Sequence, residues 1–430
     1  MSFEQGLSGL EASTQNLSVI GNNVANASTV GFKSSETLFA DVYANSLTGA
    51  GSNQVGIGVQ VNDVEQEFTQ GNITSSSNPL DIAINGGGFY EMSNNGAISY
   101  TRNGQFQLDK DGFITNSSGD ILQGYAVNAA GVLQTGSTAD LQINTANIPP
   151  AATSKVQAQL NLDSQDTIPT TTPFSTTDPT TYNYSSAITV YDSLGDAHTL
   201  QTYYVKTGPT SGAPAGTEAT WNVYASLDSK EVSGTTPPTA IGTLAFNTSG
   251  ALDPATTTPT MPWTLSNLNV TSGATSPLGS NLAAGGVTLD FTGTTQYGAA
   301  DATSSLKQDG FTSGQLSSFS ASADGTIVGS YTNGQSATLG QIALATFTDP
   351  NGLQNLGNNE WAATSTSGPA LVGTPGSGNL GVVQSSATED SNVDLTSQLV
   401  NMITAQEDYQ ANAQTIKTEN DLLQTLVTLR

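Results

Sequence analysis

His198 is the residue from which acid–base chemistry would have to start, because the chain contains one histidine. Asp192 and Asp196 precede it closely, and a Ser-His-Asp triad needs a histidine held by such a carboxylate. The chain has no G-x-S-x-G motif, the strand-to-helix turn that exposes a nucleophilic serine. We therefore interpret His198 as a histidine at a strand edge, and the sequence predicts no catalytic site.

Two short segments match known ligand-binding motifs only in part. Residues 376–381 read GSGNLG, but a dinucleotide site needs a preceding strand and a following helix, and Pro375 comes just before this run. Asp109, Asp111 and Gly112 resemble part of a calcium loop, yet the glycine of an EF-hand stands at the sixth position. With no cysteine and one histidine, a structural zinc site is excluded as well. We expect a flexible linker, a hairpin turn, no cofactor and no metal.

The overall charge excludes further classes of function. Nine Lys and Arg residues stand against 35 Asp and Glu, a formal net charge of −26 over 430 residues. Binding to nucleic acid or to an anionic membrane surface requires clustered cations, so neither is expected.

No stretch approaches the roughly 18 apolar residues of a membrane span, and the start MSFEQGLSGL lacks the basic and apolar regions of a signal peptide. We expect no membrane insertion and no cleaved signal.

The two chain ends carry helical patterns that differ from the rest. Apolar residues near the N-terminus follow steps of four and three, interrupted by weaker positions at Thr14 and Gly21. This predicts a helix that ends near residues 21–26. A longer stripe predicts a second helix over 393–428, capped by Ser391 or Asn392. The apolar stripe residues are Phe3, Leu7, Leu10, Leu17, Val24, Leu395, Leu399, Met402, Tyr409, Ile416, Leu423 and Val427.

The middle of the chain reads as β-structure. Alternating runs are joined by turn pairs such as Asn103-Gly104 and Asp324-Gly325, which favour hairpins. Residues 151–305 are richer in Thr, Pro and Ser and predict an inserted domain. The fold class is mainly β with terminal α-helices paired as a coiled coil, a discontinuous β domain, and a second β domain inserted in it. The predicted parts are 1–70, with the helix, a linker and a strand over 55–61; 71–150; the insert 151–305; 306–385; and the helical segment 386–430.

The segment after the first helix is polar and carries the first basic residue of the chain. We predict that it links the helix to the β domain, because glycine and asparagine end helices readily. The predicted link residues are Asn22, Asn23, Asn26, Gly31, Phe32 and Lys33.

Both ends resemble a known protein family. Residues 7–43, and the segments NPLDIAINGGGFY and YTRNGQFQLDKDGFITNSSG, resemble the bacterial flagellar axial proteins, which are rod and hook subunits. The C-terminal stripe resembles their shared C-terminal helix, and the segment GSYTNGQSATLGQIALATF, together with YDSLGDAHTL, is similar to the hook branch. The resemblance covers residues 1–160 and about 305–430, and the middle of the insert carries no signature.

The resemblance implies a structural protein and not an enzyme: an extracellular subunit of the flagellar hook, a flexible helical tube that passes motor torque from rod to filament. The stripe residues would mediate polymerisation of this homopolymer. Implied partners are a distal rod protein, a hook cap, a hook-length control protein, a hook–filament junction protein and the flagellar type III export apparatus. Phe3 and Leu7 match the suggested export recognition pattern of the family.

Two alternative functions are consistent with part of the same sequence. A distal-rod subunit shares both ends, but rod subunits are typically shorter and lack the large insert. A surface adhesin-like β protein would suit the Thr, Ser and Asn content, but it does not explain the terminal stripes.

Overall fold

The structure is a computed structural model that describes residues 2–42, 56–128, 131–208, 217–232, 235, 237–265 and 286–428. The chain divides into two compact units. Unit 1 comprises residues 1–145, 317–330 and 336–430, and unit 2 comprises 146–316 and 331–335. The chain therefore leaves unit 1 and returns to it, whereas the sequence places the bounds of the insert at 151 and 305.

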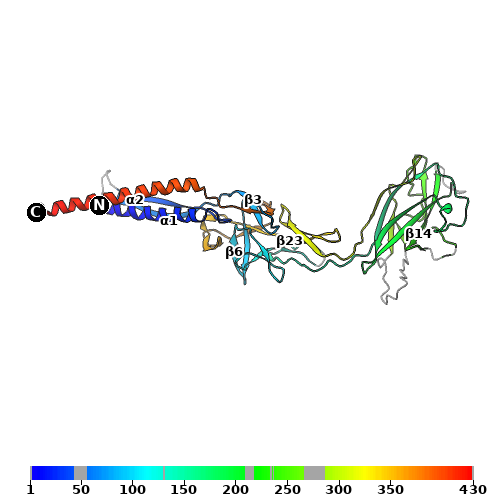
Figure 1. Cartoon of the computed structure of the whole chain (residues 1–430), viewed down its shortest axis with the longest axis horizontal. Helices are drawn as coiled ribbons and strands as arrows, with labels where there is room; N and C mark the ends of the chain where they lie inside the picture. The colour runs from blue at the N-terminus through cyan, green and yellow to red at the C-terminus, as the bar shows by residue number, and fades with distance from the viewer. Residues whose placement is uncertain are drawn as a thin grey trace. The chain divides into compact units, whose positions relative to one another are not determined.

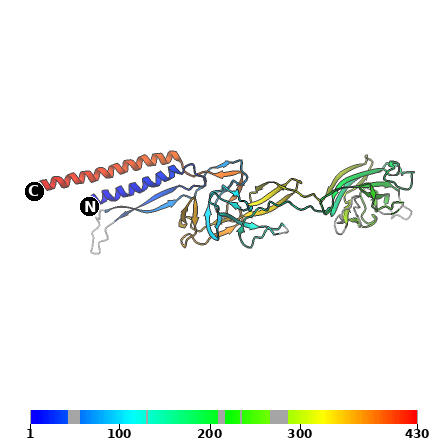
Figure 2. The ribbon, with the colours of Figure 1, turned by 60° about the horizontal axis from the view of Figure 1, so that its bottom comes forward.

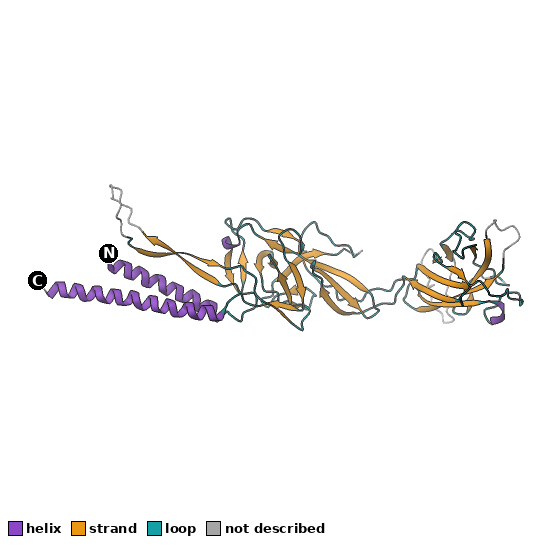
Figure 3. Ribbon diagram, turned by 90° about the horizontal axis from the view of Figure 1, so that it is seen from above, coloured by secondary structure: helices purple, strands orange, loops and turns teal. Residues whose placement is uncertain are grey.

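Two long helices from the chain ends pack side by side in unit 1. They are α1 (Ser2–Ala25) and α2 (Leu395–Thr428), and they run antiparallel (Figures 1 and 3). Their bounds agree with the predicted ends near 21–26 and 428. The predicted cap of α2 was wrong: Asp394 caps the helix, because its Oδ1 accepts the Thr396 N–H at 2.9 Å.

A long antiparallel hairpin follows α1 and lies along it (Figure 2). Its strands are β1 (Ser35–Val42) and β2 (Gly58–Gln66), with a register shift between Leu38 and Phe39. The strand predicted over 55–61 is thus displaced toward the C-terminus, and Val55 lies outside the described residues. The hairpin contacts α1 here, since the N–H of Val59 donates to Ser8 Oγ at 3.3 Å.

The body of unit 1 is a thirteen-stranded sheet, in which the strand pairs β5–β6, β5–β9, β9–β23 and β22–β23 are all antiparallel. Its strands are β5 (Phe89–Asn94), β6 (Ala97–Thr101), β7 (Gln107–Leu108), β8 (Ile114–Thr115), β9 (Ile121–Ala126), β10 (Ala139–Asp140), β21 (Leu316–Ala321), β22 (Thr326–Tyr331), β23 (Ser336–Ile342), β24 (Leu344–Thr346), β25 (Gln354–Gly357), β26 (Glu360–Ala362) and β27 (Leu371–Gly373). A short 3₁₀ helix, η2 (Pro350–Gly352), precedes β25.

Edge-to-face aromatic contacts form a core at the base of the helix pair. Phe89, Tyr100, Phe347 and Trp361 are buried together. Phe68 packs on the Trp361 ring at a centroid distance of 5.5 Å. The segment after β2 is therefore anchored in the body of unit 1.

Two further strand pairs connect distant parts of unit 1. They are β3 (Ile73–Ser75) with β29 (Ala387–Glu389), and β4 (Ile82–Asn85) with β28 (Val382–Ser385). The first pair holds the residues that precede α2 beside the residues that follow the hairpin. This pairing positions Glu389, which belongs to the site described below.

Unit 2 is a β domain built on two five-stranded sheets. Strand β11 alternates exposed and buried residues, as expected of a strand with one solvated face. The core includes Trp221, Trp263 and Phe291. Its elements are β11 (Lys155–Asp163), η1 (Pro179–Thr181), β12 (Tyr184–Tyr191), β13 (Ala197–Lys206), β14 (Thr217–Leu227), β15 (Lys230–Glu231), β16 (Gly242–Asn247), β17 (Trp263–Leu265), β18 (Val287–Asp290), β19 (Thr295–Tyr297) and β20 (Ala302–Gln308).

Among the described residues, neither helix is long and apolar enough to span a membrane.

Candidate functional site

The two terminal helices contact each other through small residues. A Cβ atom at Gly6 would lie 3.0 Å from Ile416 Cγ1, and one at Gly9 would lie 2.7 Å from Asn412 Oδ1. Farther along, Ala405 of α2 is only 2% exposed. Because glycine has no side chain, the helix backbones approach closely here, and larger residues would push them apart.

Of the predicted stripe residues, Ile416 takes part in this contact, because it faces Gly6. On α1, Phe3 and Leu7 are 45% and 50% exposed, and Leu10, Leu17 and Val24 are partly buried. The expected pairing of the two terminal helices is confirmed, and the assignment of the stripe residues to polymerisation stays a prediction. The small residues on the adjacent face of α1 allow a close approach of the helices and leave Phe3 and Leu7 uncovered.

The stripe of α2 is also largely open to solvent. Leu395 and Leu399 are each 46% exposed, and Leu423 is 52% exposed. Tyr409 is exposed, while Met402 and Ile416 are partly buried. Val427 lies in the helix, but its side chain falls outside the described residues. Both terminal helices thus present apolar side chains that unit 1 itself does not cover.

The predicted link begins with Asn22, Asn23 and Asn26, and the side chains of the last two bind backbone groups. Asn23 is 1% exposed, and its side chain pairs with the backbone of Ser35 in both directions, at 2.8 and 2.9 Å. Asn26 Nδ2 donates to the carbonyl of Asn22 at 2.9 Å and so satisfies the end of the helix. Asparagine suits both positions because one amide group both donates and accepts.

Gly31 and Phe32 form the next part of the link. Gly31 has φ +70° and its N–H donates to the carbonyl of Glu389 at 2.8 Å. A Cβ at Gly31 would lie within 2.9 Å of the Arg102 and Asn103 backbone, so only glycine fits without a shift. Phe32 is buried and anchors the segment between these contacts.

Lys33 ends the link inside a buried ionic cluster. Its Nζ lies 2.7 Å from Glu389 Oε1 and donates to the carbonyl of Thr69 at 2.7 Å. Arg102 Nε lies 3.2 Å from Glu389 Oε2, and its Nη1 donates to the carbonyl of Gly88 at 2.6 Å. The Lys33 and Glu389 side chains are fully buried. The cluster thus joins three parts of unit 1: the link after α1, the segment after β6, and the approach to α2.

Burial and the neighbouring guanidinium lower the pKa of Lys33, while Glu389 opposes this effect. Two cations therefore share one carboxylate in a site without water contact, which is stable only because backbone carbonyls complete their hydrogen bonds. Burial also raises the pKa of the nearby Tyr90 phenol, which donates to the carbonyl of Ile82 at 2.5 Å. Sequence reasoning identified Lys33 but missed Arg102 and Glu389. The scarcity of basic residues was the available signal for Arg102.

The remaining motifs close turns, as expected. Asp109 Oδ1 accepts the N–H groups of Asp111 and Phe113 at 2.9 and 2.8 Å, which closes the β7–β8 turn. Residues 376–381 connect β27 to β28, so no helix follows them. No group of three or more potential metal-ligating side chains occurs among the described residues.

His198 holds two turns of unit 2 together. Its Nδ1 lies 2.7 Å from Asp228 Oδ2, and its Nε2 lies 3.6 Å from Asp192 Oδ2. Asp196 does not face the ring but donates its N–H to Asp192 at 2.8 Å. These contacts describe a structural histidine at the edge of β13, in agreement with the sequence interpretation.

Comparison with known proteins places this arrangement in a family. Four family models match: "Flagella basal body rod protein" over residues 3–33, "Flagellar hook protein FlgE/F/G D1 domain" over 83–165, "Flagellar basal body protein FlaE D2 domain" over 161–311 and "Flagellar basal body rod FlgEFG protein C-terminal" over 384–429. Flagellar hook protein FlgE of Salmonella typhimurium is 42% identical, with 100% of both chains covered. The chain belongs to the flagellar hook protein family.

More distant members agree with this assignment. FlgE of Escherichia coli K12 is 40% identical, with 100% of both chains covered. FlgE of Borreliella burgdorferi is 31% identical, covering 100% of this chain and 99% of the relative. The structure of Helicobacter pylori hook protein FlgE2 matches with a TM-score of 0.50 at 14% identity, covering 72% of this chain and 99% of that one, and supports the fold alone. The protein is thus a structural component of the extracellular flagellar hook and not an enzyme.

Proposed function

We propose that this chain polymerises into the flexible helical tube of the hook and transmits motor torque from the rod to the filament. The observation that carries the proposal is the pair of uncovered apolar stripes on α1 and α2. Burying each of these side chains against a neighbouring copy would contribute roughly 1.5–3 kcal/mol. A contact between two different faces of identical subunits builds an open helical filament when its rotation does not close into a ring.

The link and the ionic cluster would transmit force within each subunit. Asn23, Gly31 and Lys33 connect the helix pair to the body of unit 1 through buried contacts, so the helices and the body move together. The domain divisions 1–70, 71–150, 151–305, 306–385 and 386–430 follow this proposal, with the helix pair forming the polymer and the insert contacting its neighbours.

The partners and the export route belong to the same proposal. The tube would grow on the distal rod protein beneath the hook cap. A hook-length control protein would set its length, and a junction protein would join it to the filament. The flagellar type III apparatus would export the chain without a cleaved signal, recognising Phe3 and Leu7. The exposure of both residues supports a role outside the fold of the single chain.

The test compares two neighbouring positions on α2. Leu399 belongs to the stripe, whereas Val400 is 57% exposed and lies about 100° around the helix from it. We expect Leu399→Glu to be exported normally but to stop hook assembly, and Val400→Glu to assemble. Export is measured in the culture medium and assembly by electron microscopy. Equal assembly by both variants would contradict the stripe as the polymer contact.

Deletion of the gene tests the function itself. Basal bodies with a complete rod and neither hook nor filament are the expected result. A truncated rod would instead indicate the distal-rod subunit. Normal flagella would remove the axial role and favour the adhesin-like alternative.

A further inference from the structure

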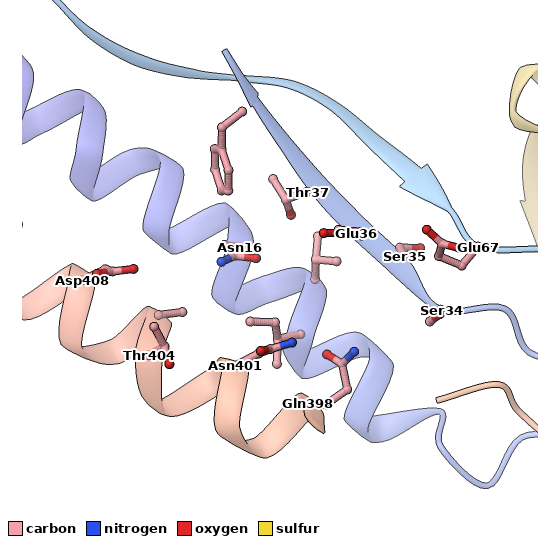
Figure 4. Close-up of a pocket in the computed structure, with 14 residues that line it drawn as sticks. Asn16, Ser34, Ser35, Glu36, Thr37, Glu67, Gln398, Asn401, Thr404 and Asp408 are labelled. Atoms are coloured by element: carbon pink, nitrogen blue, oxygen red, sulfur yellow. The ribbon is translucent and has the colours of Figure 1, made fainter. Parts of the chain in front are cut away.

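A polar groove lies beside the helix pair, at the end where α1 meets the link. It has a volume of about 400 Å³ and is bordered by α1, α2 and the start of the hairpin. Figure 4 shows Asn16 of α1, Thr37 of β1 and Asp408 of α2 around it, and Glu67, which directly follows β2, also lines it. Unit 1 alone therefore builds this groove.

The hydroxyl of Thr37 marks the groove as a site that needs a partner. Thr37 is 6% exposed, and its Oγ1 is buried without a hydrogen-bond partner among the described residues. Buried hydroxyl groups are normally paired, because an unpaired one loses its water without compensation. In Figure 4 the Thr37 oxygen is directed toward the helices, into the groove that the residue lines.

The charge of the groove selects the partner. Glu36, Glu67 and Asp408 line it, and none of its described lining residues is cationic. A Lys ammonium carries three donors and no acceptor, so it matches a hydroxyl and carboxylates at once. The aromatic ring of Phe39, which is 47% exposed at the groove, would contact the aliphatic part of such a side chain.

Few cations of unit 1 are available for this role. Lys33 and Arg102 are buried with Glu389, and Lys110 pairs with Asp111 at 3.0 Å. Lys417 is exposed and makes no ion pair within the described residues. Arg430 lies outside the described residues.

Lys417 also lies where a neighbouring copy would meet it. Gly6 lies opposite Ile416, so only residues 2–5 of α1 extend past this point, whereas residues 417–428 of α2 do. The end of α2 projects beyond α1 (Figure 1). Leu422 in this projecting segment is 56% exposed. Unit 1 thus has a projecting helix end that carries Lys417 beside Glu419 and Asp421, and an anionic groove at the other end of its helix pair.

We infer that Lys417 of one copy inserts into the groove of the next copy and pairs with Asp408 and the Thr37 hydroxyl. This inference rests on the proposed polymerisation. It adds how neighbouring copies are aligned, with the end of α2 of one copy against the base of the helix pair of the next. Within one chain the two residues lie nine positions apart on a helix, roughly 14 Å, so they cannot pair with each other.

A charge exchange tests the contact. The full-length chain is prepared as wild type, Lys417→Glu, Asp408→Lys and the double variant, and the rate of polymerisation is followed by light scattering and electron microscopy. Lys307→Glu is the matched control, because Lys307 is exposed in unit 2 and the change in charge is the same. We expect each single variant to polymerise at least tenfold more slowly, the double variant to recover most of the rate, and the control to match wild type.

Three results would overturn the inference. Normal polymerisation of Lys417→Glu would exclude this residue as the occupant. Failure of the double variant to recover would exclude the pairing with Asp408. Equal slowing by Lys307→Glu would assign the effect to net charge. If wild type itself does not polymerise, the proposed function fails first, and this result is distinguishable from failure of the contact alone.

Discussion

The buried cluster around Glu389 leads to a specific prediction about stability. Glu389→Gln removes the one carboxylate that faces both Lys33 and Arg102 and leaves two cations buried together. At an effective dielectric constant of about 20, Coulomb's law gives roughly 6 kcal/mol for opposite charges at the 2.7 Å of the Lys33–Glu389 contact. Part of this is offset by the cost of burying the charges, and breaking such a pair from one side typically costs about 3–5 kcal/mol. We therefore expect Glu389→Gln to lower the free energy of unfolding of unit 1 by about 3–5 kcal/mol.

The measurement must separate the two units, because a single unfolding curve would average them. Hydrogen–deuterium exchange at increasing urea concentrations reports the free energy of opening of each segment. We expect peptides from 67–102 and 382–394 to lose protection, while those of unit 2 keep theirs. Adding Lys33→Met to the Glu389→Gln variant should restore part of the protection, since it removes one of the two unpaired cations.

An exposed ion pair provides the control. Lys110 and Asp111 lie 3.0 Å apart, but their side chains are 88% and 58% exposed. Asp111→Asn should leave the free energy of unfolding nearly unchanged, because water and salt screen such pairs. If Glu389→Gln were no more destabilising than Asp111→Asn, the reasoning that this cluster holds the link to the body of unit 1 would be refuted.

Three further predictions concern packing and protonation. Gly9→Leu should separate α1 from α2 and cost about 1–3 kcal/mol by thermal unfolding, whereas Gly21→Leu should not, since nothing lies within 4 Å of a Cβ there. Gly31→Ala should destabilise unit 1 more than Gly119→Ala does: both glycines have positive φ, but only Gly31 faces backbone at contact distance. Burial and the neighbouring Asp120 raise the pKa of Glu360, so its stabilising effect is present below its ordinary pKa and is lost as pH rises toward the raised value. Urea unfolding of Glu360→Gln against pH should lack that loss; parallel curves for variant and wild type would contradict the assignment.

The helices and many turns were predictable because their causes are local. The apolar period of the C-terminal segment fits a helix regardless of what it contacts, and the ends of α1 and α2 agree with it to within a few residues. Asp109 closes its hairpin through bonds to residues two and four positions away. The cap of α2 was missed because Ser391, Asn392 and Asp394 are all good caps, and Asn392 is used instead to accept the Ser34 N–H at 2.8 Å.

The stripe positions were predictable as apolar but not as uncovered. A repeat of four and three identifies one face of a helix, and it does not say which face meets the other helix. That choice follows from the steric fit of Gly6 and Gly9 against Ile416 and Asn412, which depends on the partner as much as on α1 itself.

The sequence by itself determined the terminal helices, the β-rich middle, the absence of cysteine chemistry and the position of the link. The tertiary structure alone decided that Lys33 meets Glu389, 356 residues away in the chain, and that Thr37 borders a groove without a hydrogen-bond partner. The physical reason is the separation along the chain over which each kind of interaction acts. Backbone propensity and periodicity act over a few residues, whereas an ion pair or a groove exists only after β3 and β29 have brought distant segments together.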